Sequence, residues 1–312
     1  MDNITKNVVI PVDGSRNSLK SLDYLNLMYG AEHKLQVSLL YILPALPPIL
    51  TDPKTMDKRI RAKLKVVEQK NVQMAERILS EAAAVLVKQG FDEKDISVFY
   101  KKMERTTARD IFNWANKKQV DAVLLTRRGQ TDLETFFMGG ISGNLVNYCR
   151  NRPVWILGGG IRSQKVLLCV DSSDNALRAV DHAGYMLSGT ECRITIFHTM
   201  RHLSRFVPLE VIEDASELQE LWKTKAGQEI ASYLEKAKKM LLNAGINEGQ
   251  IETKVIEGNR SAAENILREA RNNGYGTIIA GRRGLSAVKE FFMGSVTSKI
   301  LHNSIGLAIW IV

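Results

Sequence analysis

A long internal repeat is the feature that most constrains the fold of this 312-residue chain. The pattern Arg-Arg-Gly followed by Phe-Phe-Met-Gly spans residues 127–139 and returns, 155 positions later, at residues 282–294. The apolar segment 8–13 likewise matches 166–171, in both cases ending in aspartate. Stacking repeats have periods of about 20–50 residues, so a unit of this length is a whole domain.

The repeat predicts two tandem domains, residues 1–158 and 159–312. The expected boundary is the flexible triplet Gly158-Gly159-Gly160, which follows an apolar strand pattern. With 45% hydrophobic residues, each half can bury a core of its own.

Short apolar runs alternate with long amphipathic runs in each half. Strands are expected at 7–12, 36–43, 96–101, 122–125 and 154–157, and again at 165–170, 193–199, 251–256, 277–280 and 308–312. Helices are expected between them, at about 15–29, 56–89, 107–117 and 144–151 in the first half. This alternation predicts the α/β class, as two doubly wound parallel-sheet domains with ligands at the carboxyl ends of the strands.

The composition excludes several other classes of protein. The longest uncharged apolar run, residues 35–50, is too short and too rich in proline to span a bilayer, and the N-terminus lacks the apolar core of a signal peptide. We therefore expect a cytoplasmic protein without a membrane partner. The cysteines Cys149, Cys169 and Cys192 form no Cys-x-x-Cys pair, so we expect small core residues rather than disulfides or a metal site.

The net charge of +9 is concentrated in the first half. Part of it is the run from Lys58 to Lys65, whose helical spacing favours a solvated helix surface. A nucleic-acid or anionic-membrane surface would normally bring interleaved aromatic residues or a recognisable module, and the run has neither. The charge therefore argues against a nucleic-acid partner.

A glycine-rich segment after the strand at 277–280 carries the clearest chemistry. Gly281, Gly284 and Gly294 let backbone N–H groups approach an anion, and Ser295 opens the last expected helix, whose N-terminus favours phosphate. The hydroxyls of Ser295 and Thr297 can add donors. A generic glycine turn with a helix cap is the alternative interpretation.

An aspartate ends the first strand of each half. The Asp171 carboxylate can accept hydrogen bonds from ribose hydroxyls or a base amino group, although a helix N-cap is equally compatible with its position. Asp171 and the glycine segment are expected at the same sheet edge, and Asp13 repeats the arrangement with Gly129 and Gly139. This convergence favours a nucleotide cleft.

These residues resemble the universal stress protein family, in its tandem two-domain form. The family signature is Gly, two residues, Gly, nine residues, Gly, then Ser or Thr, and Gly281, Gly284, Gly294 and Ser295 match every position. The resemblance implies an adenine nucleotide alpha-hydrolase-like fold and a bound adenine nucleotide, ATP or AMP, with Mg²⁺ at the phosphates left open. It assigns to the adenosine Cys169, Asp171, Thr199 and Ala280, and to the phosphates Gly281, Gly284, Gly294, Ser295 and Thr297.

The first half departs from the signature at two positions. Thr126 stands in place of the first glycine and Gly140 in place of the hydroxyl residue, although Ser142 could compensate. An added β-carbon and a missing hydroxyl both weaken phosphate binding. We therefore expect a degenerate, weaker first site, formed by Pro11, Asp13, Ile42, Gly129 and Gly139.

No residue constellation for covalent or metal catalysis is evident. The five histidines are scattered, and His198, at a strand end, is interpreted as a packed or capping residue. No Gly-Lys-Ser/Thr phosphate loop is present. We therefore expect a stress-response regulatory protein that binds nucleotide in its second domain and acts through conformation or an unidentified protein partner. The alternatives are a slow ATP hydrolase and a nucleotide-free interaction scaffold.

The last strand of each half carries tryptophan at an equivalent position, Trp155 and Trp310. Apolar edge strands need cover, and single domains of the family that the chain resembles pair through this strand. We expect the two copies to pair within one chain as a pseudo-twofold intramolecular dimer. A further homodimer is left open.

Overall fold

A computed structural model describes residues 5–30, 34–47, 50, 58–127, 151–201, 216–258, 261–284 and 293–312. The chain divides into two compact units. The first comprises residues 1–26 and 30–154, and the second comprises residues 27–29 and 155–312. The predicted boundary at residue 158 stays a prediction.

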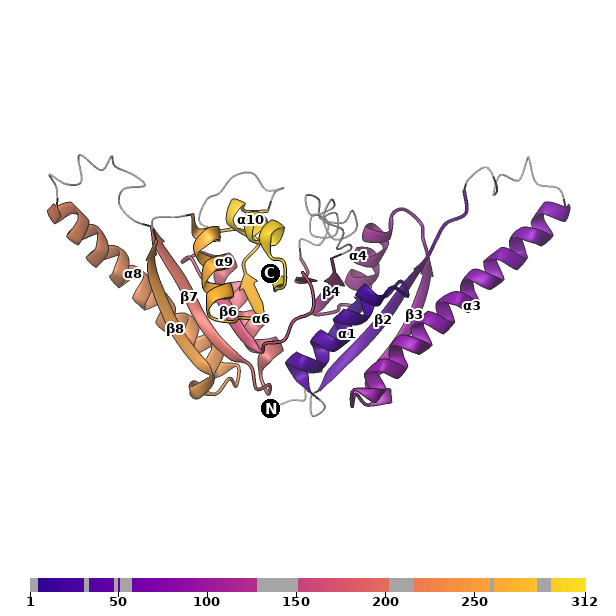
Figure 1. The fold of residues 1–312 in the computed structure, drawn as a ribbon, viewed down its shortest axis with the longest axis horizontal. Helices are drawn as coiled ribbons and strands as arrows, with labels where there is room; N and C mark the ends of the chain where they lie inside the picture. The colour runs from indigo at the N-terminus through magenta and orange to yellow at the C-terminus, as the bar shows by residue number, and fades with distance from the viewer. Residues whose placement is uncertain are drawn as a thin grey trace. The chain divides into compact units, whose positions relative to one another are not determined.

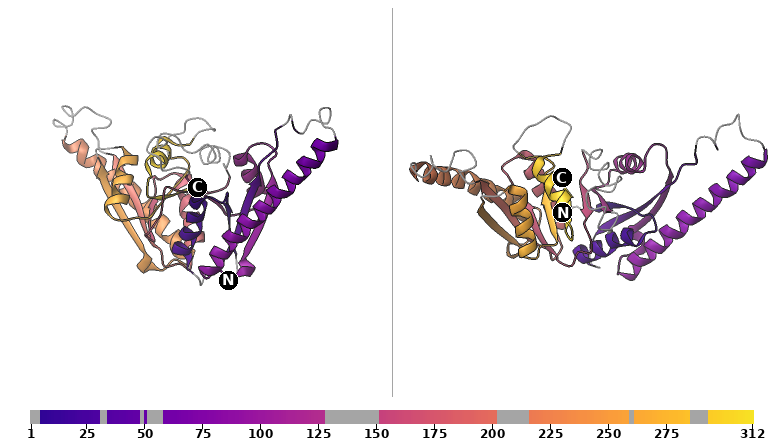
Figure 2. Two further views of the ribbon diagram at one scale, coloured as in Figure 1. Left: turned by 45° about the vertical axis from the view of Figure 1, so that its right-hand side comes forward. Right: turned by 45° about the horizontal axis from the view of Figure 1, so that its top comes forward.

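The first unit is built on a sheet with the strand order β3-β2-β1-β4-β5. The strands are β1 (Lys6–Pro11), β2 (Leu35–Leu43), β3 (Ile96–Lys102), β4 (Ala122–Thr126) and β5 (Val154–Leu157), of which residues 155–157 group with the second unit. The helices are α1 (Arg16–Tyr29), α3 (Lys58–Lys88) and α4 (Thr107–Lys117), with a 3₁₀ turn η1 (Glu93–Asp95). In every view, α3 runs alongside β2 and β3 (Figures 1 and 2).

The second unit repeats this plan with the order β10-β9-β6-β7-β8. Its strands are β6 (Lys165–Cys169), β7 (Arg193–Arg201), β8 (Ile251–Gly258), β9 (Thr277–Ala280) and β10 (Ala308–Ile311). Its helices are α6 (Asp174–Leu187), α8 (Ser216–Asn243), α9 (Ala262–Asn272) and α10 (Ser295–Asn303), with a 3₁₀ turn η3 (Glu248–Gln250). β9 pairs in parallel with both β6 and β10, and β7 pairs in parallel with β6 and β8.

The predicted fold class is confirmed. In the second unit α6 packs against α8, and α9 packs against α10, so the sheet is covered by two helix pairs. Residues of β4 from Ala122 to Leu125 and all of β9 are buried, as in a parallel sheet covered on both faces. The described strands lie within two residues of their expected ends. The helix expected at 144–151 falls almost entirely outside the described residues.

Hydroxyl side chains fix where four of the helices begin. Ser15, Thr106, Ser173 and Ser261 each accept a hydrogen bond from a backbone N–H in the first turn of α1, α4, α6 and α9 respectively. Such caps satisfy donors that have no partner within the helix. The caps recur at equivalent positions in both halves, so the duplicated sequence carries duplicated start signals.

Two tryptophans lie at the centre of the second unit's core. The rings of Trp155 and Trp310 stack with centroids 3.8 Å apart, and both side chains are fully buried. The indole N–H of Trp155 donates to Nε2 of His182 at 3.2 Å. Burial lowers the pKa of His182 to about 3, so the imidazole is neutral and can accept this bond.

The composition-based expectations have different outcomes. Among the described residues, no helix is long and apolar enough to cross a membrane, and none of His, Cys, Asp and Glu gather in a metal-binding group of three. Cys192 is a buried core residue as expected, Cys169 is only partly buried, and Cys149 lies outside the described residues. Arg59, Arg61, Lys63 and Lys65 are exposed on α3, which confirms the solvated helix surface.

Candidate functional site

A cavity of about 520 Å³ opens at the carboxyl ends of β6, β7 and β9 in the second unit. This is within the usual size range of small-molecule sites. All nine residues that the sequence assigns to the second-domain site contribute to its wall: Cys169, Asp171, Thr199, Ala280, Gly281, Gly284, Gly294, Ser295 and Thr297. The structure therefore brings together residues that are up to 128 positions apart in sequence, from Cys169 to Thr297.

The first two signature glycines are required by close packing. A β-carbon at position 284 would lie 2.0 Å from Oδ2 of Asp171, and one at position 281 would lie 2.9 Å from the carbonyl carbon of Asn175. Neither distance is one that a β-carbon adopts without a shift, so a side chain at position 281 would displace backbone of α6 and one at position 284 would displace the Asp171 carboxylate. The glycine segment is therefore packed against the end of β6 and the first turn of α6.

Backbone hydrogen bonds hold the described ends of the glycine segment together. The Gly294 N–H donates to the carbonyl of Arg282 at 2.9 Å, and the Arg282 N–H donates to the carbonyl of Val312 at 2.7 Å. The buried hydroxyl of Thr297 donates to the carbonyl of Gly281 at 2.8 Å. A hydroxyl has a single proton, so Thr297 uses its proton to hold the segment and not to contact a ligand.

The N-terminus of α10 is built differently from those of α1, α4, α6 and α9. Its N-cap is Gly294, which provides no side-chain cap, and the first helical bond runs from the Ser298 N–H to the Gly294 carbonyl at 2.9 Å. The N–H groups of Ser295, Val296 and Thr297 precede that bond, so they have no i−4 carbonyl within the helix. All three residues line the cavity, and such a helix end favours an anion.

Asp171 supports the start of α6 without being its cap. Oδ1 of Asp171 accepts from the Ser173 hydroxyl at 2.6 Å and from the Ser173 N–H at 3.3 Å. Ser173 is the N-cap, since its Oγ accepts from the Ala176 N–H at 3.2 Å. The N-cap alternative for Asp171 is therefore wrong, and its carboxylate lines the cavity beside Gly284.

The charge of this carboxylate affects two neighbouring groups, Tyr233 and Cys169. The phenol of Tyr233, from α8, donates to the carbonyl of Ser173. Burial, together with the negative charges of Asp171 and Asp174, raises the pKa of Tyr233 to about 12. Desolvation of the thiol and the charge of Asp171 also raise the pKa of Cys169, so the thiol is protonated at pH 7 and is a poor nucleophile.

The end of β7 forms the other side of the cavity. Nδ1 of His198 lies 2.8 Å from the carbonyl of Val170, and the Thr199 hydroxyl accepts from the side-chain amide of Asn265 at 3.0 Å. Burial lowers the pKa of His198, against the opposing effects of the Val170 carbonyl, Asp171 and Glu229. The sequence predicts a packed or capping residue at His198, and its ring is packed against the end of β6 through this contact with Val170.

Sequence reasoning missed one wall of the cavity, which belongs to α8. Trp222, Ala226, Glu229 and Ile230 line it, and their spacing of four, seven and eight residues from Trp222 places them on one helix face. That spacing was readable in the sequence. What the sequence did not show is that this face, rather than another, turns toward the carboxyl ends of the strands.

The candidate residues of the first unit are only partly described. Pro11, Asp13, Ile42 and Thr126 lie at strand ends, and Asp13 is exposed, with Oδ1 accepting from the Ser15 N–H at 3.0 Å. This repeats the contact between Asp171 and Ser173. Gly129, Gly139, Gly140 and Ser142 lie outside the described residues, so the weaker first site stays a prediction.

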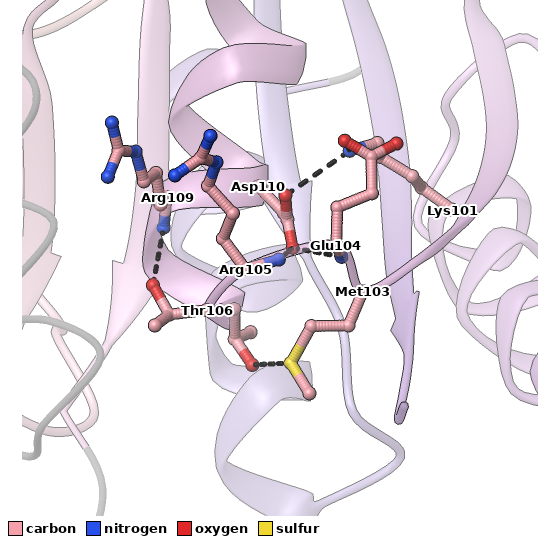
Figure 3. Close-up of polar contacts among 8 residues, drawn as sticks. Lys101, Met103, Glu104, Arg105, Thr106, Arg109 and Asp110 are labelled. Carbon is pink, nitrogen blue, oxygen red and sulfur yellow. Dashed lines mark hydrogen bonds and ion pairs between the residues drawn. The ribbon is translucent and has the colours of Figure 1, made fainter. Parts of the chain in front are cut away.

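The buried carboxylate of Asp110, in the first unit, has an uncharged counterpart in the second. Asp110, on α4, is fully buried, and it accepts from the N–H groups of Glu104 and Arg105 at 2.9 and 3.1 Å and pairs with Lys101 at 3.2 Å (Figure 3). The equivalent residue of the second unit is Asn265, whose amide instead supports Thr199 in the cavity wall. The same helix position thus bonds the loop before α4 in the first unit, through Asp110, and a residue of the cavity wall in the second, through Asn265.

Comparisons with known proteins agree with this architecture. The family model of the universal stress protein family matches residues 5–157 and again residues 162–305. The curated universal stress protein YxiE of Bacillus subtilis (strain 168) is 28% identical over 145 residues, which cover 44% of this chain and 90% of that protein.

Solved structures share the two-unit fold over nearly the whole chain. A universal stress protein from Archaeoglobus fulgidus DSM 4304 has a TM-score of 0.65 at 18% identity, covering 98% of this chain and 97% of that one. The functionally unknown protein PA1789 from Pseudomonas aeruginosa PAO1 has a TM-score of 0.57 at 13% identity, covering 99% and 92%. Because the family model matches both halves, this chain belongs to the universal stress protein family and contains two of its domains in tandem.

Proposed function

We propose that the second unit binds an adenine nucleotide, ATP or AMP, in the cavity at the ends of β6, β7 and β9. The observation that carries this proposal is the packing of Gly284 against Asp171, which joins the glycine segment and the first-strand carboxylate in one wall. A chain that needed only a turn at position 284 would not require this close approach.

The phosphates are proposed to lie at the N-terminus of α10. The N–H groups of residues 295–297, the hydroxyl of Ser295 and the neighbouring Arg283 supply donors and positive charge there. The Asp171 carboxylate accepts from the ribose hydroxyls. We expect any Mg²⁺ to be coordinated mainly by the phosphate oxygens of the nucleotide and by water.

The proposed role is regulatory, in a stress response, with the nucleotide changing the conformation of the protein or its affinity for a protein partner. The Cys169 thiol is protonated at neutral pH, so the cavity holds no activated thiol nucleophile, and Nδ1 of His198 bonds the Val170 carbonyl and does not activate a neighbouring side chain. At most we expect slow ATP hydrolysis. A nucleotide-free scaffold is the remaining alternative, and it predicts that no adenine nucleotide binds.

Two matched alanine substitutions test the site. In Gly284→Ala the new β-carbon meets Oδ2 of Asp171 at 2.0 Å, so either the carboxylate or the loop must move, and we expect at least a tenfold loss of ATP affinity by calorimetry. Gly249→Ala is the control, because a β-carbon there meets nothing within 4 Å. Melting temperatures without ligand show whether each variant folds. ATP binding to folded Gly284→Ala with unchanged affinity would refute the site.

A further inference from the structure

The order of the strands gives the cavity a direction. β6 lies between β9 and β7, and the cavity spans the carboxyl ends of all three strands. The glycine segment follows β9, Asp171 follows β6, and His198 and Thr199 lie near the end of β7. Strands are about 4.8 Å apart, so the end of β7 lies about 10 Å from that of β9, a span comparable to the length of a nucleotide.

The chemistry of the wall changes along this direction. Near β9 and α10 it carries the three signature glycines, the hydroxyls of Ser295 and Thr297, and Arg283, alongside the apolar Ala280, Val296 and Ile300. Near β7 it is largely apolar, with side chains from β7, α8 and α9: Phe197, Met200, Trp222, Ala226, Ile230 and Ile266. If the phosphates occupy the first end, as the proposed function requires, the flat aromatic purine ring packs against the apolar side chains of the second.

In the described part of the chain, three polar side chains line this largely apolar end: His198, Glu229 and Thr199, whose hydroxyl accepts from Asn265. His198 lines the cavity, and its Nδ1 is 2.8 Å from the Val170 carbonyl, which can only accept. Nδ1 therefore carries the proton. Because burial lowers the pKa of His198, the ring is neutral, and Nε2 presents a lone pair.

We infer that His198 is a base-recognition residue, whose Nε2 accepts a hydrogen bond from the exocyclic 6-amino group of adenine. This inference rests on the proposed nucleotide site. A 6-keto group, as in guanine, would set a carbonyl oxygen against the lone pair of Nε2 and be disfavoured. The equivalent residue of the first unit, at the matching strand position, is Tyr41.

Two substitutions of His198 test the roles of Nδ1 and Nε2 separately. The amide of His198→Asn can take the place of Nδ1 and keep the bond to Val170, but it leaves nothing at Nε2. The longer amide of His198→Gln reaches the place of Nε2, where its oxygen can accept, and gives up the bond to Val170. A merely structural role for His198 predicts damage in the Gln variant and tolerance in the Asn variant, the reverse of base recognition.

The probes are ATP and purine riboside triphosphate, which is ATP with hydrogen in place of the 6-amino group. We expect calorimetry on the full chain to show a preference for ATP of about five- to tenfold in the wild type, typical of one neutral hydrogen bond. The preference should fall to about one in His198→Asn, through weaker ATP binding, and persist in His198→Gln.

The outcomes distinguish a failure of the proposed role of His198 from a failure of the proposed nucleotide site. A wild type that binds both triphosphates equally, or a His198→Asn variant that keeps the preference, would overturn the role of His198 while leaving the nucleotide site in place. A wild type that binds neither triphosphate would overturn the proposed function itself, and the role of His198 with it.

Discussion

Gly284 and Asp171 act as one structural unit although 113 residues separate them. The absent side chain at position 284 makes room for the carboxylate, and a β-carbon would lie 2.0 Å from it. The carboxylate in turn holds the Ser173 cap of α6 through a 2.6 Å bond. A signature glycine therefore shapes the cavity and, through Asp171, supports the start of a helix.

His182 makes the second unit sensitive to acid. Its folded-state pKa is about 3, against an ordinary value of 6.5, so between these values the unfolded chain binds the additional proton. Stability is retained above pH 6.5 and decreases as the pH falls toward 3, by at most about 1.4 kcal/mol per pH unit from this group.

Denaturant unfolding at pH 7, 6, 5 and 4 measures this slope. His182→Gln keeps an acceptor for the Trp155 N–H but cannot be protonated, so its stability should fall less steeply with acid than that of the wild type. Parallel slopes for the two proteins would show that His182 does not contribute.

At the scale of the element, a side chain of α10 bonds the residue that follows β9, and the N-terminus of α10 has no side-chain cap. The hydroxyl of Thr297 holds the Gly281 carbonyl, and Gly294 leaves the first turn without a side-chain cap. One residue of the helix thus supports the fold while its neighbours face the cavity. The two roles can be separated by substitution.

Thr297→Val keeps the shape of the side chain and removes the proton, so the Gly281 carbonyl loses its partner. We expect a loss of about 1–2 kcal/mol in the free energy of unfolding, a few degrees in melting temperature. The exposed Ser295 has no such role. Ser295→Ala should therefore leave the melting temperature nearly unchanged and lower the affinity for ATP several-fold. A destabilised Ser295→Ala with a stable Thr297→Val would contradict this division.

The sequence predicted the elements well because their signals are local. Apolar runs and the repeat itself place β9 and α10, and hydroxyl caps place the starts of α1, α4, α6 and α9. The glycine spacing points to Asp171 through the rule that parallel strands end at one edge. Three features required the tertiary structure. These are the α8 wall around Trp222, the use of the Thr297 proton within the protein, and the contact of His198 with Val170, since each depends on how separate elements pack.

For the whole molecule, the two units share the same strand order but differ in the residues at the carboxyl ends of their strands. Asp110 holds a loop where Asn265 supports the cavity, and Thr126 ends β4 where Gly281 follows β9. A β-carbon at position 281 would lie 2.9 Å from the backbone of Asn175, which indicates how much a threonine at the equivalent position changes. We therefore expect the two units to differ in nucleotide binding, with the first in a structural role.

Calorimetric titration of the intact chain with ATP tests this account most directly. We expect one tight site per chain, with any second binding event weaker. Asp171→Ala should abolish the tight event, and the matched Asp13→Ala should leave it nearly intact. Two equivalent tight sites, or a tight event that is lost in Asp13→Ala and retained in Asp171→Ala, would contradict it.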